Sequence, residues 1–174
     1  MEIMLDIETM GNGSNSAIIA IGAVAFDIND ISSRFYQQVN LQSSIDAGME
    51  MDASTVLWWL KQSDDARSAF KVNEKSLNIS NALIEFSMFC ESVNVCGMWG
   101  NGAAFDNALL SNAYRKLEIE QPWKFWNDRC YRTVKNIYQY VEFVRSGTNH
   151  NAVDDAESQA LHLIEICKKH GISL

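Results

Sequence analysis

The sequence predicts an α/β fold in which α-helices flank a mixed central β-sheet. Three apolar stretches rich in β-forming residues open the chain, and segments with helical periodicity follow, interrupted by one further apolar run. With 174 residues, 47% of them hydrophobic, the chain is long enough for one buried core and short for two. We therefore expect a single domain over residues 1–174.

The first three predicted strands follow one another closely. Turn-forming residues at 11–16 separate the first strand from the second, and the polar run at 27–30 predicts a hairpin turn. The third strand is therefore expected to lie antiparallel to the second. A fourth strand comes later in the chain and ends at Gly100-Asn101-Gly102. Strands are expected at residues 3–7, 17–26, 33–41 and 93–99.

Helical patterns account for most of the remaining chain. Asp52 or Ser54 is suited to cap a helix whose apolar residues include Trp59. The last helix repeats small and apolar residues on one side, among them Ala156 and Ala160. Further helices are expected at residues 64–70, 80–90, 105–117, 132–144 and 154–169. Strands, helices, a strand and helices again give a mixed sheet covered by helices.

Charge and composition exclude some classes of function. The formal net charge of −8 argues against a protein that coats nucleic acid through bulk electrostatics. An enzyme that binds one strand end remains compatible, since carboxylates that hold metal ions are neutralised in the working protein. No apolar run approaches the length of a membrane span and no signal peptide is visible, so we expect a cytoplasmic protein with no membrane partner. The four cysteines lack C-x-x-C spacing, which favours free thiols over a zinc site.

Basic residues are concentrated between residues 115 and 145, where aromatic residues interleave with them. This mixture is typical of a surface that contacts phosphates and stacks on bases. A solvated helix face above core aromatic residues explains the same pattern equally well. Half of the fourteen lysines and arginines lie in this segment: Arg115, Lys116, Lys124, Arg129, Arg132, Lys135 and Arg145.

Two acidic residues alternate with apolar ones in the first predicted strand. Asp6 and Glu8 are two positions apart, so their side chains project from the same face of the strand. Two neighbouring carboxylates repel each other, and burying them unpaired is unfavourable. A divalent cation would remove both penalties, whereas a solvent-facing strand end would avoid them. The pair therefore suggests a metal site, with an exposed strand end as the alternative.

Three further residues can complete such a site. Asp106 lies just past the fourth predicted strand at the opening of a helix, where capping alone would also explain an aspartate. His150 precedes Asp155 by five residues, and Asp155 lies in the first turn of the last helix. A histidine beside a cation-bound water can accept its proton at neutral pH. His162 and His170 are expected to be surface residues.

These residues resemble the DEDDh branch of the DnaQ-like 3′→5′ exonucleases, whose fold is ribonuclease H-like. The three motifs of that family are matched by Asp6-Ile7-Glu8, by Phe105-Asp106 and by His150-x-Ala152-x-x-Asp155. Within the superfamily the chain is most similar to small phage and prophage enzymes described as exodeoxyribonuclease VIII-like. That resemblance is carried by LDIETMG, IIAIGAVAFD, STVLWWLKQS, ARSA, WGNGAAFDNALL, PWKFWND and HNAVDDA.

The resemblance implies hydrolysis with two divalent cations, Mg²⁺ or Mn²⁺. Asp6 would bridge the ions, Glu8 and Asp155 would complete the site of the attacking water, and Asp106 would serve the second ion. His150 would accept the proton of the water. Asp154 is the rival ligand to Asp155. We prefer Asp155 because it fits the family spacing, while Asp154 is interpreted as a helix N-cap.

The implied reaction releases nucleoside monophosphates from the 3′ ends of single-stranded DNA. The first alternative is a 3′→5′ exoribonuclease of the same fold, so the expected partner is a single-stranded DNA or RNA 3′ end. A catalytically silent nucleic-acid-binding module and a purely structural cation site are further alternatives. In the last case His150 would have no role. Related enzymes include monomers and homodimers, and a role in phage or prophage DNA metabolism follows from the resemblance alone.

Substrate contacts are expected on both sides of the carboxylates. Adjacent Trp58 and Trp59 cannot both face the core, so one is predicted to pack inward and the other to line the cleft, with a second helix contact as the alternative. Arg129 and Arg132 lie where many relatives have an aspartate-threonine pair, and their guanidinium groups would suit phosphates. The full expected set is Thr9, Met10, Gly11, Trp58, Trp59, Asn101, Phe105, Arg129 and Arg132.

Overall fold

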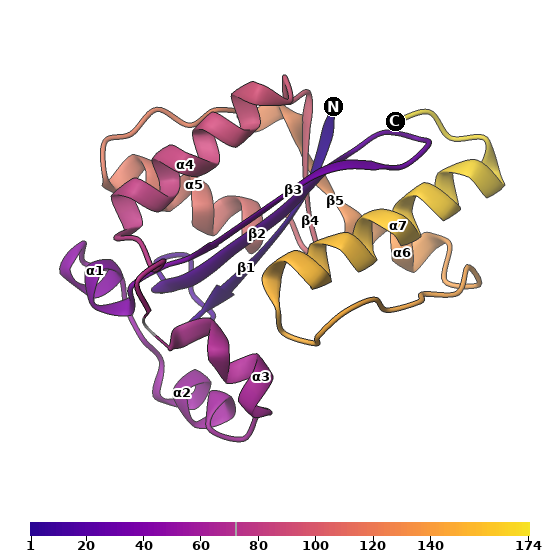
Figure 1. Cartoon of the computed structure of the whole chain (residues 1–174). Coiled ribbons are helices and arrows are strands. Elements are labelled where there is room, and N and C mark those ends of the chain that lie inside the picture. Colours follow the sequence, from indigo (N-terminus) through magenta and orange to yellow (C-terminus); the bar gives the residue numbers. More distant parts are fainter. Residues whose placement is uncertain (72) are drawn as a thin grey trace.

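The computed structural model describes residues 1–71 and 73–174, and strands in these residues form a mixed sheet in the order β3-β2-β1-β4-β5 (Figure 1). β1 pairs antiparallel with β2 and parallel with β4, which makes it the central strand. The mixed α/β architecture expected from the sequence is confirmed. The strands are β1 (Glu2–Thr9), β2 (Ile18–Phe26), β3 (Ile31–Gln38), β4 (Gly97–Gly100) and β5 (Asp128–Cys130).

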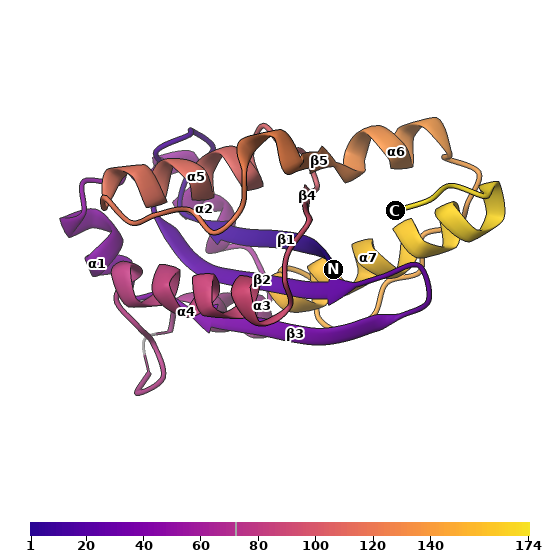
Figure 2. The ribbon, with the colours of Figure 1, turned by 90° about the horizontal axis from the view of Figure 1, so that it is seen from above.

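Helices cover both faces of the sheet. α4 and α5 pack on one face, and α6 and α7 pack on the other (Figure 1). Seen from above, α5 and α6 lie toward the β4–β5 edge, whereas α4 and α7 approach β3 (Figure 2). None of the described helices is long and apolar enough to cross a membrane. The α-helices are α1 (Leu41–Asp46), α2 (Ala53–Trp59), α3 (Asp64–Arg67), α4 (Ile79–Ser92), α5 (Asp106–Lys116), α6 (Tyr131–Ile137) and α7 (Ala152–His170), and the 3₁₀ helices are η1 (Ser68–Phe70) and η2 (Phe125–Asn127).

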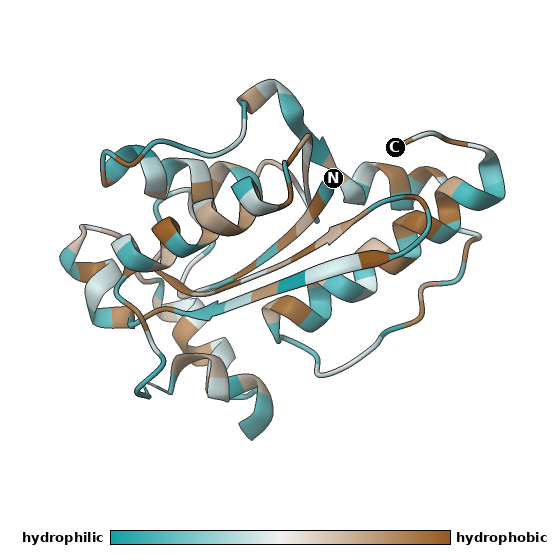
Figure 3. Cartoon of the chain, turned by 45° about the horizontal axis from the view of Figure 1, so that its top comes forward, coloured by the Kyte–Doolittle hydropathy of each residue, from teal (hydrophilic) through white to brown (hydrophobic). Residues whose placement is uncertain are grey.

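The alternation of β1 separates an apolar face from an acidic one. Ile3, Leu5 and Ile7 pack into the core beneath α4 and α5. The intervening residues face α7, and of these Met4 joins the second core cluster. In Figure 3, hydrophobic residues gather along β1 and β2, while hydrophilic and hydrophobic residues alternate along α7. The α7 face therefore holds both a small core and the acidic residues of β1.

Three predicted boundaries were wrong, and one strand was not predicted. The fourth strand begins at Gly97 because α4 continues to Ser92 and the chain then turns through Asn94 at φ 51°. The helix expected at residues 132–144 ends at Ile137, since the following segment bonds to α7 instead of continuing its own helix. The third strand stops at Gln38, because Asn40 caps a short helix that the sequence pattern did not predict. The fifth strand was also missed.

Candidate active site

Asp6 and Glu8 lie on the α7 face of β1, as the alternation predicts. Gly22 of β2 is paired with Asp6 and leaves room for the start of α7. A Cβ atom on Gly22 would lie 2.2 Å from the backbone carbon of Ala152. Because this position has no side chain, the first turn of α7 rests directly on the sheet beside Asp6. That close approach brings Asp155 to the two carboxylates of β1.

Asp106 reaches the same place from β4. β4 runs parallel to β1, with Gly100 beside Leu5, so the chain leaves β4 next to the acidic residues of β1. Asn107 anchors the start of α5, because its Nδ2 donates to the Met98 carbonyl oxygen at 2.9 Å. A Cβ on Gly100 would lie 2.3 Å from Oδ1 of Asn107. Glycine at this position therefore allows α5 to begin close against the strand and holds Asp106 in place.

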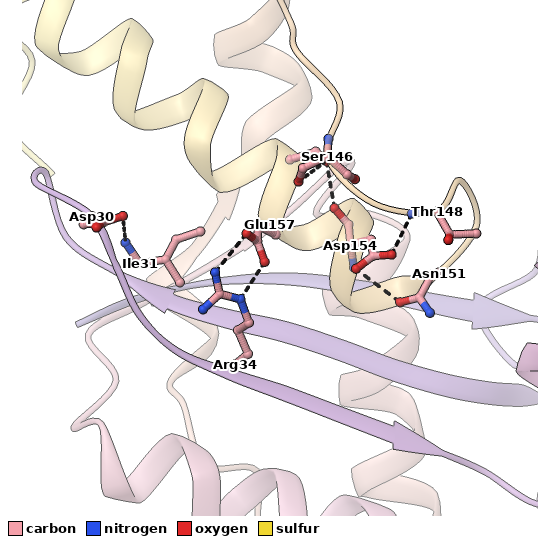
Figure 4. A network of polar contacts seen from close by, with 9 residues as sticks. Asp30, Ile31, Arg34, Ser146, Thr148, Asn151, Asp154 and Glu157 are labelled. Atoms are coloured by element: carbon pink, nitrogen blue, oxygen red, sulfur yellow. Dashed lines mark hydrogen bonds and ion pairs between the residues drawn. The ribbon is translucent and has the colours of Figure 1, made fainter.

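The first turn of α7 distinguishes Asp155 from Asp154. Asn151 is the N-cap and accepts a hydrogen bond from the backbone N–H of Asp154, so the prediction that Asp154 is the N-cap was wrong. The Asp154 carboxylate accepts the backbone N–H of Thr148 at 2.7 Å, on the loop side of the helix (Figure 4). Asp155 is turned toward the β1 carboxylates, and its Oδ2 accepts the backbone N–H of His150 at 3.0 Å.

The four carboxylates and the histidine form one cluster, in which Asp6 and His150 are half-buried and the other three residues are buried. Ligand atoms of Glu8, His150 and Asp155 all lie within 4.8 Å of one another. Glu8, Asp106 and Asp155 are 8%, 4% and 8% exposed. His150 adopts φ 61°, a left-handed conformation that is uncommon for a residue other than glycine. The structure thus assembles all five residues expected to carry the chemistry.

Burial and mutual repulsion raise the pKa of three of these carboxylates, those of Asp6, Glu8 and Asp106. Burial, followed by repulsion from Asp106, Glu8 and Asp155, raises the pKa of Asp6 well above its ordinary range. Burial and the same kind of repulsion raise the pKa of Glu8 to about 8. The pKa of Asp106 is raised by burial to about 7, although a backbone hydrogen bond with Ile7 opposes the rise. Gln159 donates to Oδ1 of Asp6 at 2.9 Å and offsets a small part of this repulsion.

The donor set fits hard divalent cations. Carboxylate oxygens dominate the cluster, and such ligands suit Mg²⁺ and Mn²⁺ better than zinc. The side-chain oxygens Oδ1 of Asn101 and Oε1 of Gln159 are also buried, without a hydrogen-bond partner in the described residues. Both residues line the same pocket as the carboxylates. A cation in this pocket would remove the repulsion that raises the carboxylate pKa values.

Two pockets meet at Glu8. The first, of about 240 Å³, is lined by Asp6, Glu8 and Asp155 together with basic and aromatic side chains. The second, of about 420 Å³, extends from Glu8 toward α2 and is walled by Thr9, Trp58, Trp59 and Phe105. An acidic pocket beside an aromatic-walled one can hold a phosphate with its metal ions on one side and a nucleoside on the other.

Comparison with known proteins identifies the family. The sequence model of the 3′-5′ exoribonuclease Rv2179c-like domain matches residues 1–167. The chain belongs to this family. An exodeoxyribonuclease of Enterobacteria phage T4 is 26% identical, over 76% of this chain and 69% of the relative.

Solved structures with the same fold are more distant in sequence. The nuclease domain of 3′hExo, a DEDDh family member bound to rAMP, superposes with a TM-score of 0.68 at 11% identity, covering 99% of this chain and 94% of that one. Exonuclease X in complex with 5′ overhanging duplex DNA has a TM-score of 0.64 at 14% identity, covering 98% and 93%. The fold is therefore the ribonuclease H-like fold of the DEDDh exonucleases. The family match shows that the protein is a 3′-5′ exonuclease.

The two tryptophans of this exonuclease divide their roles. Trp59 is 2% exposed, and its Nε1 donates to the carbonyl oxygen of Thr9 at 2.9 Å. Trp58 is 41% exposed, and its ring lies edge-on to His150 with centroids 4.9 Å apart. Trp59 thus fixes the end of β1 from inside, while Trp58 remains accessible in the pocket. Contact between Trp58 and a terminal base stays a prediction.

The other expected substrate contacts are not all brought to the site. Arg132 donates to the backbone oxygen of Asn101, next to Asp106. Arg129 lies elsewhere: its Nε is 3.4 Å from Glu2, and its guanidinium sits over the ring of Trp99. Arg129 therefore lies away from the carboxylate cluster, and the expectation that it holds a phosphate was wrong. Its guanidinium pairs with Glu2, near the opposite end of β1 from Glu8.

Met10 and Gly11 line neither pocket. The side chain of Met10 is 5% exposed and belongs to the core. The carbonyl oxygen of Gly11 accepts the hydroxyl of Thr9 at 2.7 Å, which shapes the loop after β1. Any substrate contact by these two residues would therefore use their backbone, and this contact stays a prediction.

Three polar residues near the site were not assigned to it from the sequence, although Lys135 and Arg145 belong to the basic segment at residues 115–145. Gln159 lies four residues after Asp155 on α7, and this i, i+4 spacing was a usable signal that both face β1. Lys135 and Arg145 line the acidic pocket, but Arg145 follows a segment wrongly predicted to be helical. The surface expectation for His162 was also wrong: it is 4% exposed, and its Nδ1 lies 2.7 Å from the hydroxyl of Tyr131.

Proposed function

We propose that this exonuclease releases nucleoside monophosphates from the 3′ ends of single-stranded DNA by two-metal-ion hydrolysis. The observation that carries the proposal is the convergence of four carboxylates and one histidine in one cluster, with three of the carboxylates buried. Exoribonuclease activity is the second candidate, and the description of the matched family favours it. The phage relative described as an exodeoxyribonuclease supports DNA.

Each residue of the cluster has a role that its position supports. Asp6, Glu8, Asp106 and Asp155 would hold two Mg²⁺ or Mn²⁺ ions, which supply water activation and charge neutralisation at the scissile phosphate. His150 would accept the proton of the attacking water. Its backbone hydrogen bond to Asp155 and its packing against Trp58 restrict where the imidazole can point.

The aromatic-walled pocket would hold the terminal nucleoside. It begins at Glu8 and Thr9, so a nucleoside seated there places its phosphate at the carboxylates. Trp58 offers an exposed ring for base stacking, which contributes about 1–3 kcal/mol per base and tolerates any sequence. The relatives 3′hExo, bound to rAMP, and exonuclease X, in complex with DNA, support a nucleic-acid end as the partner.

The decisive test follows the shortening of labelled strands. Single-stranded DNA and RNA of matched sequence, each labelled at the 5′ end, are incubated with Mg²⁺ or Mn²⁺ and resolved on a gel over time. We expect a ladder that shortens from the 3′ end, faster on DNA, and no product with EDTA.

Variants of one helix provide the control. Asp155→Asn should abolish the ladder, whereas Glu157→Gln, two residues away on α7 and paired with Arg34, should leave it intact. His150→Ala should slow hydrolysis by about 10²- to 10⁴-fold. Full activity in His150→Ala would instead remove His150 from the proposed mechanism, and faster hydrolysis of RNA than of DNA would replace the DNA proposal with the ribonuclease one.

A further inference from the structure

Two basic residues of the 115–145 segment lie at the acidic pocket without a role in the chemistry described above. Lys135 of α6 and Arg145 of the following loop line the same pocket as Asp6, Glu8 and Asp155. Both flank one aromatic ring: Lys135 Nζ is 5.6 Å and Arg145 Cζ is 5.8 Å from the centroid of Phe143. The ring of Phe143 thus lies within cation–π distance of both basic groups, at the edge of the carboxylate cluster.

Arg145 forms a hydrogen bond with a carboxylate oxygen of Asp155 that a metal ion would need as a ligand. Its guanidinium donates to Oδ1 of Asp155, while Oδ2 of the same carboxylate accepts the backbone N–H of His150. Both oxygens of Asp155 are therefore engaged by protein donors. A cation bound to Asp155 must displace or share the contact with Arg145. The side chain of Arg145 is 40% exposed, so it is free to swing away from the cluster.

Charge balance indicates where Arg145 would go. Four carboxylates and two divalent ions cancel, which leaves the charge of a bound phosphodiester uncompensated. Among the residues that line the acidic pocket, Arg145 and Lys135 are the basic ones, and Lys135 makes no ion pair with any described carboxylate. A guanidinium released from a carboxylate can bind phosphate oxygens through the same forked geometry.

We propose that Arg145, supported by Lys135, is a substrate-contacting residue that exchanges Asp155 for the phosphodiester when metal ions bind. The exchange makes metal binding and phosphate binding mutually dependent, because the ions free the guanidinium that the phosphate requires. This inference rests on the proposed function, since it assumes a phosphodiester at the carboxylates. It assigns to the loop after α6 the part of the substrate site that sequence reasoning had sought at Arg129.

The test separates metal binding from strand binding. Mn²⁺ affinity is measured by calorimetry on the metal-free protein. Strand affinity is measured by the fluorescence anisotropy of a short 5′-labelled single-stranded DNA with Ca²⁺, and a gel verifies that the strand stays intact. Arg145→Met removes the charge and keeps the length of the side chain. Arg34→Met is the matched control, because it also removes an arginine–carboxylate pair of α7, the one that joins Glu157 to β3 (Figure 4).

Arg145→Met should bind Mn²⁺ roughly fivefold more tightly, because Asp155 loses a competing cation. The same variant should bind DNA about 10-fold or more weakly, and the slope of log affinity against log salt should fall by about 0.7. Lys135→Met should weaken DNA binding without changing Mn²⁺ affinity. Arg34→Met should alter neither quantity. Arg145→Lys keeps a charge without the fork and should recover part of the lost DNA affinity.

Two outcomes would overturn the proposal. Unchanged DNA affinity and salt slope in Arg145→Met would limit Arg145 to its pair with Asp155. Weaker Mn²⁺ binding in that variant would mean that Arg145 positions Asp155 for the ion. Failure of the proposed function looks different, since the unaltered protein would then bind no Mn²⁺ or cleave no strand. If Arg145→Met does not fold, Lys135→Met and Arg145→Lys still decide the question.

Discussion

The two faces of β1 are built for opposite purposes from alternate residues of one strand. Toward α4 and α5, Ile3, Leu5 and Ile7 are buried in an apolar core that needs no partner outside the chain. Toward α7, Asp6 and Glu8 are packed against further carboxylates, and burial together with this repulsion raises their pKa values. The apolar face contributes stability, and it supports an acidic face that is unfavourable until its charge is neutralised.

Asp6→Asn gives the largest expected effect, and it concerns activity. Removing the carboxylate at the centre of the cluster should lower the hydrolysis rate at least about 10³-fold, which corresponds to several kcal/mol of transition-state stabilisation. The same change should raise the melting temperature of the metal-free protein, since it relieves repulsion by Asp106, Glu8 and Asp155. Initial rates and thermal unfolding measure the two effects. A variant that loses activity and also melts earlier would contradict this description of the acidic face.

Leu5→Ala probes the other face at the next position. Leu5 is fully buried, and its truncation should lower the free energy of unfolding by about 2–5 kcal/mol. Below its melting temperature, the variant should retain the Mn²⁺ affinity of the unaltered protein, because the acidic face is unchanged. Urea unfolding and calorimetry at low temperature provide the measurements. A large loss of Mn²⁺ affinity in the folded variant would show that the two faces are not separable.

The acidic face should also make stability depend on pH. Glu8 has a pKa of about 8 in the folded protein against an ordinary value of 4.5, so the folded state retains a proton that the unfolded chain releases. The contribution of Glu8 to the stability of the metal-free protein is therefore most favourable below about pH 4.5. It becomes less favourable as the pH rises toward 8. Asp106, with a pKa of about 7, acts in the same direction.

Added Mn²⁺ should reverse that dependence. Because the ion binds ionised carboxylates and only the folded state assembles them, its stabilising effect should be greater at pH 8 than at pH 5. Melting temperatures with and without Mn²⁺ at both pH values give the difference directly. Equal stabilisation at the two pH values would argue against ion binding at Glu8 and Asp106.

The period of two in β1 explains why so much of this site could be predicted from sequence. Asp6 and Glu8 had to share a face in any strand, and the structure places them together on the α7 side. Asp106 and Asp155 lie in the first turns of helices whose close approach to the sheet depends on Gly100 and Gly22. The spacing of the motifs favoured Asp155 over Asp154, and the orientation of the two side chains in the first turn of α7 agrees.

Tertiary contacts explain what could not be predicted. The strand at 128–130 has only three residues with no apolar pattern, and it exists because β4 offers it an edge. The helix at 131–137 stops where Val141 can bond to His162, a residue distant in sequence. That early end lets the following loop bring Arg145 to Asp155. A local pattern carries no signal for such contacts.

Trp58→Ala should have the smallest effect, and it tests whether the aromatic pocket belongs with the acidic face. Trp58 is the exposed ring of the pocket and contacts His150, whereas Trp59 is buried beneath it. If the terminal base stacks on Trp58, the substitution should raise KM by about 10-fold and change kcat less, in keeping with 1–3 kcal/mol for one stacked base. Trp58→Phe should restore most of the affinity. A fall in kcat alone would instead mean that Trp58 serves the reaction by orienting His150, and the acidic face would then extend to α2.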